Sequence, residues 1–111
     1  MTAEQFKARL GSADHRFADT LAFIEQHYHY QPSAFSNGDL RNSEEQNQGS
    51  CKLLAMALDL GLSDAQTLHC FAEHYLTVLD NPEGNEHANI RSLMKQGLAG
   101  VRFDRQPLTR R

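Results

Sequence analysis

The centre of this chain is the apolar run Ser50-Cys51-Lys52-Leu53-Leu54-Ala55-Met56-Ala57-Leu58-Asp59-Leu60-Gly61. Serine is a good helix N-cap and glycine commonly ends a helix, so the run predicts one helix between them. At 100° per residue its apolar side chains occupy two sides, and only Lys52 and Asp59 share a polar stripe. A helix that is apolar nearly all round is buried between its neighbours. We therefore predict that this is the central helix and that Cys51 lies on an apolar face.

Four further helices are predicted around it. Thr2 with Gln5 and Ser63 with Gln66 form capping-box patterns, which begin helices, and Gly11 and Gly97 follow helical patterns as terminators. The apolar residues Phe17, Leu21, Ile24 and Tyr28 form one helical stripe, and a second stripe is made by Leu68, Phe71, Tyr75, Val78 and Leu79. We expect these four helices at residues 3–10, 13–28, 64–80 and 87–96.

Residues 29–49 match no helical pattern. Asn37-Gly38 is a strong hairpin signal, and a two-residue turn there would pair Ser36 with Asp39 and Phe35 with Leu40. Val101–Phe103 alternates briefly and could add a third strand. The predicted fold class is mainly α with a minor β component, a compact bundle of about five helices with a long polar loop and a small hairpin. The alternative is a purely helical fold with an irregular loop.

Length, charge and composition predict a single-domain protein that does not cross a membrane. Its 111 residues predict a single domain, which we place at 1–103, with a basic, solvated C-terminal tail at 104–111. The formal net charge of −3 disfavours nucleic acid, and no apolar run is long enough to cross a membrane. The N-terminus has no secretory signal pattern, so the two cysteines are expected to be free thiols in a cytoplasmic protein.

Three ordered motifs resemble one known family. They are the run from Tyr30 to Asp39 with its Pro32-Ser33-Ala34-Phe35-Ser36-Asn37-Gly38, the run Gln46-Asn47-Gln48-Gly49-Ser50-Cys51-Lys52, and the run His87-Ala88-Asn89-Ile90-Arg91. Together they are similar to the HopJ type III effector family, over roughly Phe6 to Phe103. The resemblance implies no defined biochemical activity. The resemblance implies delivery into a host cell by type III secretion, with a host protein as the partner. These implications stand beside the cytoplasmic location expected above.

Two kinds of chemistry are considered for the polar side chains. Cys51 follows a Gly-Ser turn at a helix N-terminus, and with His74 or His87 and Asn47 it would resemble the Cys-His-Asn set of a thiol hydrolase. Burial of Cys51 on the apolar face argues against that reading. The histidines and acids lack metal-ligand spacing, so we expect no metal site and no cofactor. The chain is more consistent with a non-enzyme than with the hydrolase.

The polar loop within residues 35–52 is the preferred candidate for recognition. It carries amide side chains, which both donate and accept hydrogen bonds. The structural alternative is that these amides satisfy backbone groups in an ordered loop, and that Arg91 and Lys52 form ordinary ion pairs within the chain. The resulting hypothesis is a protein-interaction module whose partner and oligomeric state are undetermined, with binding residues Asn37, Asn42, Gln46, Asn47, Gln48 and Arg91.

Overall fold

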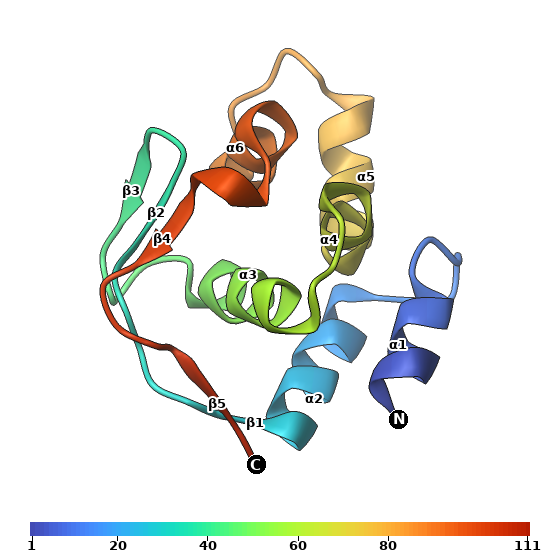
Figure 1. Cartoon of the computed structure of the whole chain (residues 1–111). Coiled ribbons are helices and arrows are strands. Elements are labelled where there is room, and N and C mark those ends of the chain that lie inside the picture. The colour runs from blue at the N-terminus through green and yellow to red at the C-terminus, as the bar shows by residue number, and fades with distance from the viewer.

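The computed structural model describes the whole chain, residues 1–111, as an α+β globule built around one helix. Figure 1 shows α3 in the middle, with α6 above it, the other helices to its right, and the short strands to its left and below it. The helices are α1 (Ala3–Arg9), α2 (Phe17–His27), α3 (Gln48–Leu60), α4 (Asp64–Cys70), α5 (Glu73–Asp80) and α6 (Ala88–Gln96). The strands are β1 (Tyr28–Tyr30), β2 (Phe35–Asn37), β3 (Leu40–Asn42), β4 (Val101–Phe103) and β5 (Leu108–Arg110), and a short 3-10 helix η1 spans Leu98–Gly100.

The central position of α3 confirms the main prediction from the sequence. Cys51 and every residue from Leu53 to Ala57 are buried, and Gly61 ends the helix in a left-handed conformation. The helix begins two residues before Ser50, because Asn47 takes the cap position with a φ of 51°. Exposed Leu58 and Asp59 mark the one side that faces solvent. Helix α3 is thus the element against which the rest of the chain packs.

Helix α2 starts later than predicted, at Phe17 and not near Ala13. His15 turns inward and is buried, with its Nε2 2.8 Å from the hydroxyl oxygen of Thr20. The backbone N–H of Arg16 donates to the carboxylate of Asp19, which satisfies a group at the new helix start. The prediction missed this because an inward histidine before the helix has no periodic signature.

The predicted helix at 64–80 is two helices. The chain breaks at Ala72, whose φ of 52° lies in a region unfavourable for a residue with a side chain. The break changes the direction of the chain, so that Cys70 and Phe71 before it and Val78 after it all reach the core. Tyr75 is half-buried as the core prediction requires, whereas Leu79 is 47% exposed and leaves the predicted stripe. Tertiary packing here divides the segment into two helices, although the apolar periodicity of its sequence is continuous.

The hairpin and the third strand form as predicted, but the turn lies one residue later, so each residue of the first strand pairs two positions further along the second. Asn37 pairs with Leu40, so the two turn residues are Gly38 and Asp39. Gly38 has a φ of +60°, as the first position of this kind of turn requires. The predicted pairing of Phe35 with Leu40 is wrong, because the observed register places Phe35, Asn37 and Asn42 on the buried face. Strand β4 joins on the other side of β2, giving the order β3-β2-β4.

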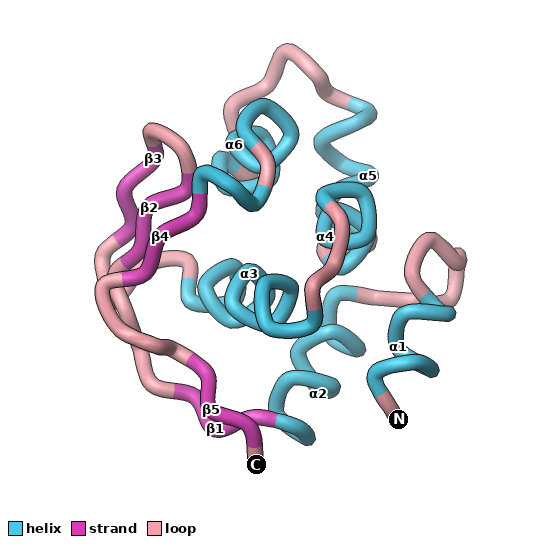
Figure 2. Tube along the Cα trace, in the orientation of Figure 1, coloured by secondary structure: helices cyan, strands magenta, loops and turns pink.

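The last residues do not form the solvated tail expected from their charge. Strand β5 pairs antiparallel with β1, and Figure 2 shows the two strands side by side at the foot of the molecule. Pro107 and Leu108 are buried, so the segment contributes apolar area to the core as well as surface charge. Arg110 donates to the carboxylate of Asp59 on α3, which ties the strand to the central helix.

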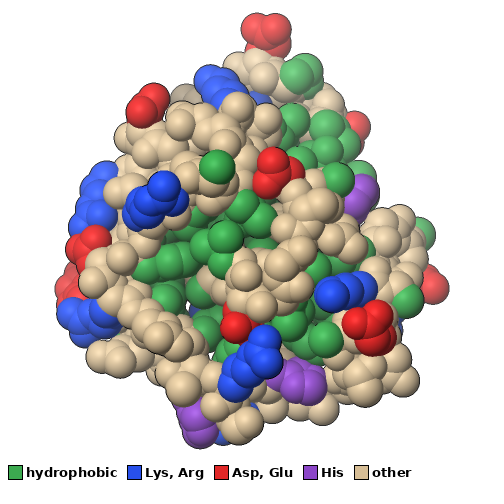
Figure 3. All heavy atoms as spheres, in the orientation of Figure 1, with side chains coloured by type: hydrophobic (Ala, Val, Ile, Leu, Met, Phe, Trp, Pro, Cys, Tyr) green, Lys and Arg blue, Asp and Glu red, His purple; other side chains and the backbone are tan.

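Apolar side chains gather in the middle of the face drawn in Figure 3, between α3, α4, α6 and β4, and charged ones lie mostly around its rim. None of the helices combines the length and apolar character that a membrane crossing requires.

Candidate functional site

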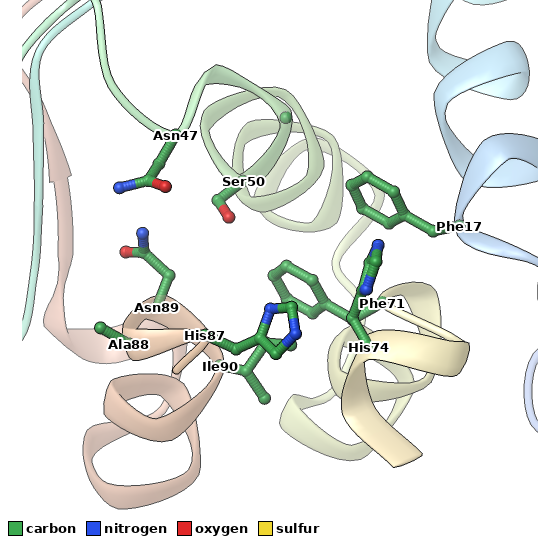
Figure 4. A pocket seen from close by; sticks show the side chains of 10 residues that line it. Phe17, Asn47, Ser50, Phe71, His74, His87, Ala88, Asn89 and Ile90 are labelled. Atoms are coloured by element: carbon green, nitrogen blue, oxygen red, sulfur yellow. The ribbon is translucent and has the colours of Figure 1, made fainter. Parts of the chain in front are cut away.

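A cavity of about 330 Å³ lies where the starts of four helices meet. Asn47, Gly49 and Ser50 come from the start of α3, and His87 to Ile90 come from the start of α6. Phe71 and His74 come from the break between α4 and α5, and Phe17 is the first residue of α2. Figure 4 shows these side chains around one hollow, with the amides of Asn47 and Asn89 on one side and the rings of Phe17 and His74 on the other.

Two histidines lie side by side in the wall of the cavity. The ring centroids of His74 and His87 lie 5.0 Å apart, and the rings of Phe17 and His74 make a T-shaped contact with centroids 4.9 Å apart. No hydrogen bond or ion pair within the protein uses a ring nitrogen of either histidine. Imidazole both donates and accepts hydrogen bonds. The pair is therefore free to engage a molecule that enters the cavity.

The backbone at the cavity is set by two residues in the left-handed conformation. Asn47 (φ 51°) and His87 (φ 55°) precede α3 and α6, and neither side chain caps its helix by a hydrogen bond. The first N–H groups of a helix have no partner within the helix itself. No group of the protein accepts from the N–H of Gly49 or Ser50 in α3, or from that of Ala88 or Asn89 in α6. The cavity is consequently rich in unused donors.

A network of asparagines holds the polar segment beside this cavity. The Nδ2 groups of Asn37 and Asn42 both donate to Oδ1 of Asn89, at 3.1 and 3.2 Å. Nδ2 of Asn89 donates back to Asn42 at 3.0 Å, and Asn47 donates to the same Asn42 oxygen at 2.8 Å. Asn37, Asn42 and Asn89 are almost wholly inaccessible. The network thus joins the hairpin to the starts of α3 and α6.

Several residues predicted to bind a partner serve the fold. Asn37 and Asn42 are buried in the network, and the Gln48 amide bridges the hydroxyl of Tyr30 and the carbonyl of Ser33. Arg91 donates to the carbonyl oxygens of Asn81 and Pro82 and pairs with Glu86 at 2.7 Å, as the structural alternative predicted. Lys52 forms no ion pair but lies over the ring of Tyr30, 4.4 Å from its centroid. Of the predicted binding residues, Gln46 and Asn47 are exposed, and Asn47 also lines the cavity.

The structure separates Cys51 from the histidines with which it was grouped. The thiol is wholly buried and donates to the carbonyl oxygen of Ser33 at 3.8 Å, away from the cavity wall. Burial raises the pKa of the Cys51 thiol to about 11, which keeps it protonated and poorly nucleophilic at neutral pH. His74, His87 and Asn47 do meet as grouped, but their neighbour at the cavity is the hydroxyl of Ser50. The geometry does not support a thiol hydrolase.

Sequence reasoning singled out only Asn47, His74 and His87 among the ten residues that line the cavity, and it missed Ser50, Phe17 and Asn89. Ser50 was assigned only as a helix cap, and Phe17 only as core. Asn89 belongs to the third of the three motifs, and its chemistry shows only once the hairpin is seen to bond to it. The one available sequence signal for Ser50 and Asn89 was their position in the second and third motifs, each of which includes the start of a helix that lines the cavity.

Comparison with known proteins establishes the family. The model of the HopJ type III effector protein family matches residues 3–108, and the chain belongs to that family. A crystal structure titled as that of the unknown function protein VPA0580 has a TM-score of 0.92 and 39% sequence identity, over 100% of this chain and 95% of that one. None of the curated proteins matches. The fold described above is therefore that of a solved relative, whose title assigns no activity.

Proposed function

We propose that this HopJ-family protein is a protein-interaction module whose recognition site is the cavity between α3, α5 and α6, together with the exposed polar residues beside it. The single observation that carries the proposal is a concave site in which the rings of His74 and His87 and the N–H groups at the very start of α3 and α6 have no partner in the protein. His87 is exposed and His74 is half-buried, so both rings are open to a partner from outside the protein. A wall of uncommitted donors suits recognition of an external group.

The exposed part of the polar segment extends this surface. Gln46 and Asn47 are exposed, and the asparagine network fixes the backbone that carries them. A loop held in place before binding loses less conformational entropy when a partner arrives. We therefore revise the original hypothesis: the buried amides position the surface, and the exposed ones contact the partner. Because the family is described as type III effectors, host-cell proteins are the first candidate partners.

Photo-crosslinking tests the surface directly. A benzoylphenylalanine at position 46 is expected to capture a defined partner from a host-cell extract, whereas the same probe at Thr109 on β5 is the matched control, because that residue is exposed but lies on another part of the fold. Replacing His74 and His87 with alanine in the probe-bearing protein should reduce capture, with an unchanged melting temperature. Equal capture from both probe positions, or capture unaffected by the histidine changes, would contradict the proposal.

A further inference from the structure

His15 is the only one of the six histidines that is buried, with 4% of its surface exposed. It lies in the connection between α1 and α2 and contacts both helices. Its ring meets that of Phe6 on α1 edge to face, with centroids 5.4 Å apart, and its Nε2 lies 2.8 Å from the hydroxyl oxygen of Thr20 on α2. The Thr20 hydroxyl donates in turn to the carbonyl oxygen of Cys70 on α4 at 2.8 Å. The His15 ring and its hydrogen-bond partner therefore connect three helices.

The protonation state of His15 follows from these contacts. The one hydrogen of the Thr20 hydroxyl is given to Cys70, so the hydroxyl oxygen can only accept from His15, and Nε2 carries the proton of the neutral ring. Nδ1 is then an unprotonated acceptor, and this buried atom has no hydrogen-bond partner in the protein. A second proton would have to bind Nδ1, where it would create a charged donor without an acceptor. Such a group is costly inside a protein.

Charged and titratable groups lie around His15 on every element next to it. They are Arg9 on α1, Asp19 on α2, His69 on α4, Glu73 and Tyr75 on α5, and Asp14 and Arg16 in the connection itself. None of them bonds to the ring, and both Asp19 and Glu73 already have an arginine at 3.6 Å. Burial has the largest effect and lowers the pKa of His15, whereas Asp19 and Glu73 raise that pKa and Arg9 lowers it. The neighbouring charges therefore do not offset the burial of an imidazolium.

Helix α1 is held on the rest of the protein by side chains. No backbone-to-backbone hydrogen bond links residues 1–15 to the remainder of the chain, and Figure 1 shows α1 at the edge of the molecule. The ring of Phe6 stacks on that of Phe23 on α2, with centroids 4.3 Å apart, and His15 packs against the same Phe6 ring. A helix of seven residues is not stable by itself. The position of α1 therefore depends on these few contacts.

We propose that His15 is a pH-sensitive clasp: its neutral ring holds α1 and the connection to α2 (residues 1–16) in place, and its protonation releases them. The inference is independent of the proposed function. In acid the ring takes up a proton from solvent at Nδ1 and leaves its buried site, because water solvates the imidazolium and the core does not. Phe6 then loses its contact with His15, and α1 separates from α2 while the remaining helices keep their packing. The released segment uncovers the apolar face of α2 that carries Phe23.

Hydrogen exchange followed by mass spectrometry at pH 7.5 and 5.0, corrected for the intrinsic pH dependence of exchange, tests the clasp. Most carboxylates keep their charge over this range, whereas a histidine with a pKa near 6.5 does not. A histidine that is protonated only in the released segment favours release by at most about thirtyfold between these two pH values. We expect the protection of α1 amides to fall about tenfold. The same amides should be at least about tenfold less protected than those of α3 at pH 5.0, because α1 opens separately.

Histidine variants assign the effect. His15→Gln keeps a side chain that can donate to Thr20 but cannot take up the proton, so the pH dependence of α1 protection should disappear. His27→Gln is the matched control, because Nε2 of His27 donates to the carbonyl oxygen of Met1 at 2.7 Å and so also contacts the N-terminal segment. The pH dependence should remain in that variant. It should remain in His69→Gln as well, because His69 is exposed although it lines the same small hollow as His15.

Three results would overturn the inference: unchanged α1 protection between pH 7.5 and 5.0, a pH dependence that persists in His15→Gln, or equal protection of α1 and α3. If His15→Gln leaves α1 unprotected already at pH 7.5, the other two variants decide. Their α1 protection must still fall below pH 6.5, and loss of the pH dependence in either one would assign it to that histidine and not to His15.

Discussion

Replacing Asn42 with alanine is expected to lower the free energy of unfolding by about 2–3 kcal/mol. The change removes three hydrogen bonds, two with Asn89 and one with Asn47. Oδ1 of Asn89 keeps its bond from Asn37, and the exposed Asn47 amide can turn to water. Nδ2 of Asn89, however, stays buried without an acceptor, and an orphaned donor of this kind costs about 1–3 kcal/mol.

Thermal unfolding followed by circular dichroism measures this loss. An unfolding entropy of about 2.1 cal/mol/K per residue over 111 residues converts 2–3 kcal/mol into a melting temperature lower by roughly 10 °C. Asn85→Ala is the matched control, because Asn85 is exposed and forms no hydrogen bond, and it should change the free energy by less than about 0.5 kcal/mol. The double variant Asn42→Ala with Asn89→Ala should be less destabilised than the sum of the single variants. If Asn42→Ala melts within about 4 °C of the wild type, the network does not hold the loop as argued.

Three further outcomes are expected. Burial lowers the pKa of His15 below its ordinary value near 6.5. As pH falls, the unfolded chain therefore binds this proton before the folded protein does. The contribution of His15 to stability is complete above the ordinary pKa and is lost as pH falls below that pKa. Urea unfolding at pH 7.5 and 5.5 should show a smaller loss for His15→Gln than for the wild type, and equal losses would refute the assignment. Iodoacetamide near neutral pH should modify Cys51 and Cys70 only after unfolding, as followed by mass spectrometry, because both thiols are fully buried; rapid labelling of native Cys51 would restore the hydrolase hypothesis. Gly38→Ala should destabilise the protein by about 1–2 kcal/mol, since φ is +60° and a residue with a side chain is strained there, whereas Asp39→Ala at the next turn position should not.

All three family motifs supply residues to the cavity or to the hydrogen-bond network beside it. The first motif supplies Asn37, the second supplies Asn47 and Ser50, and the third supplies His87 and Asn89. Asn37 does not reach the cavity but bonds to Asn89, which does. The residues that carry the resemblance are thus arranged around one hollow and its support, although they lie up to 52 positions apart in the chain.

The helical skeleton could be predicted because its signals are local. Thr2 with Gln5 and Ser63 with Gln66 form the reciprocal hydrogen bonds of capping boxes, each within four consecutive residues. The burial of α3 followed from apolar residues on both of its sides, and Gly61 and Gly97 end their helices where they were expected to. Each of these features depends on neighbours within one or two turns of the chain. The sequence by itself therefore determined which regions are helical, where several helices end, and which of them is central.

Contacts between distant segments decided the rest. The hairpin register depends on Asn37 and Asn42 reaching Asn89, about fifty positions away, and no turn rule contains that partner. The break at Ala72 lets Phe71 and Val78 both reach the core, although the periodic pattern runs through it without interruption. The cavity exists only because the starts of separate helices converge, which pairs His74 with His87 and leaves Cys51 inside the core. Hydrogen bonding and packing across the chain, which local patterns do not encode, created the candidate site.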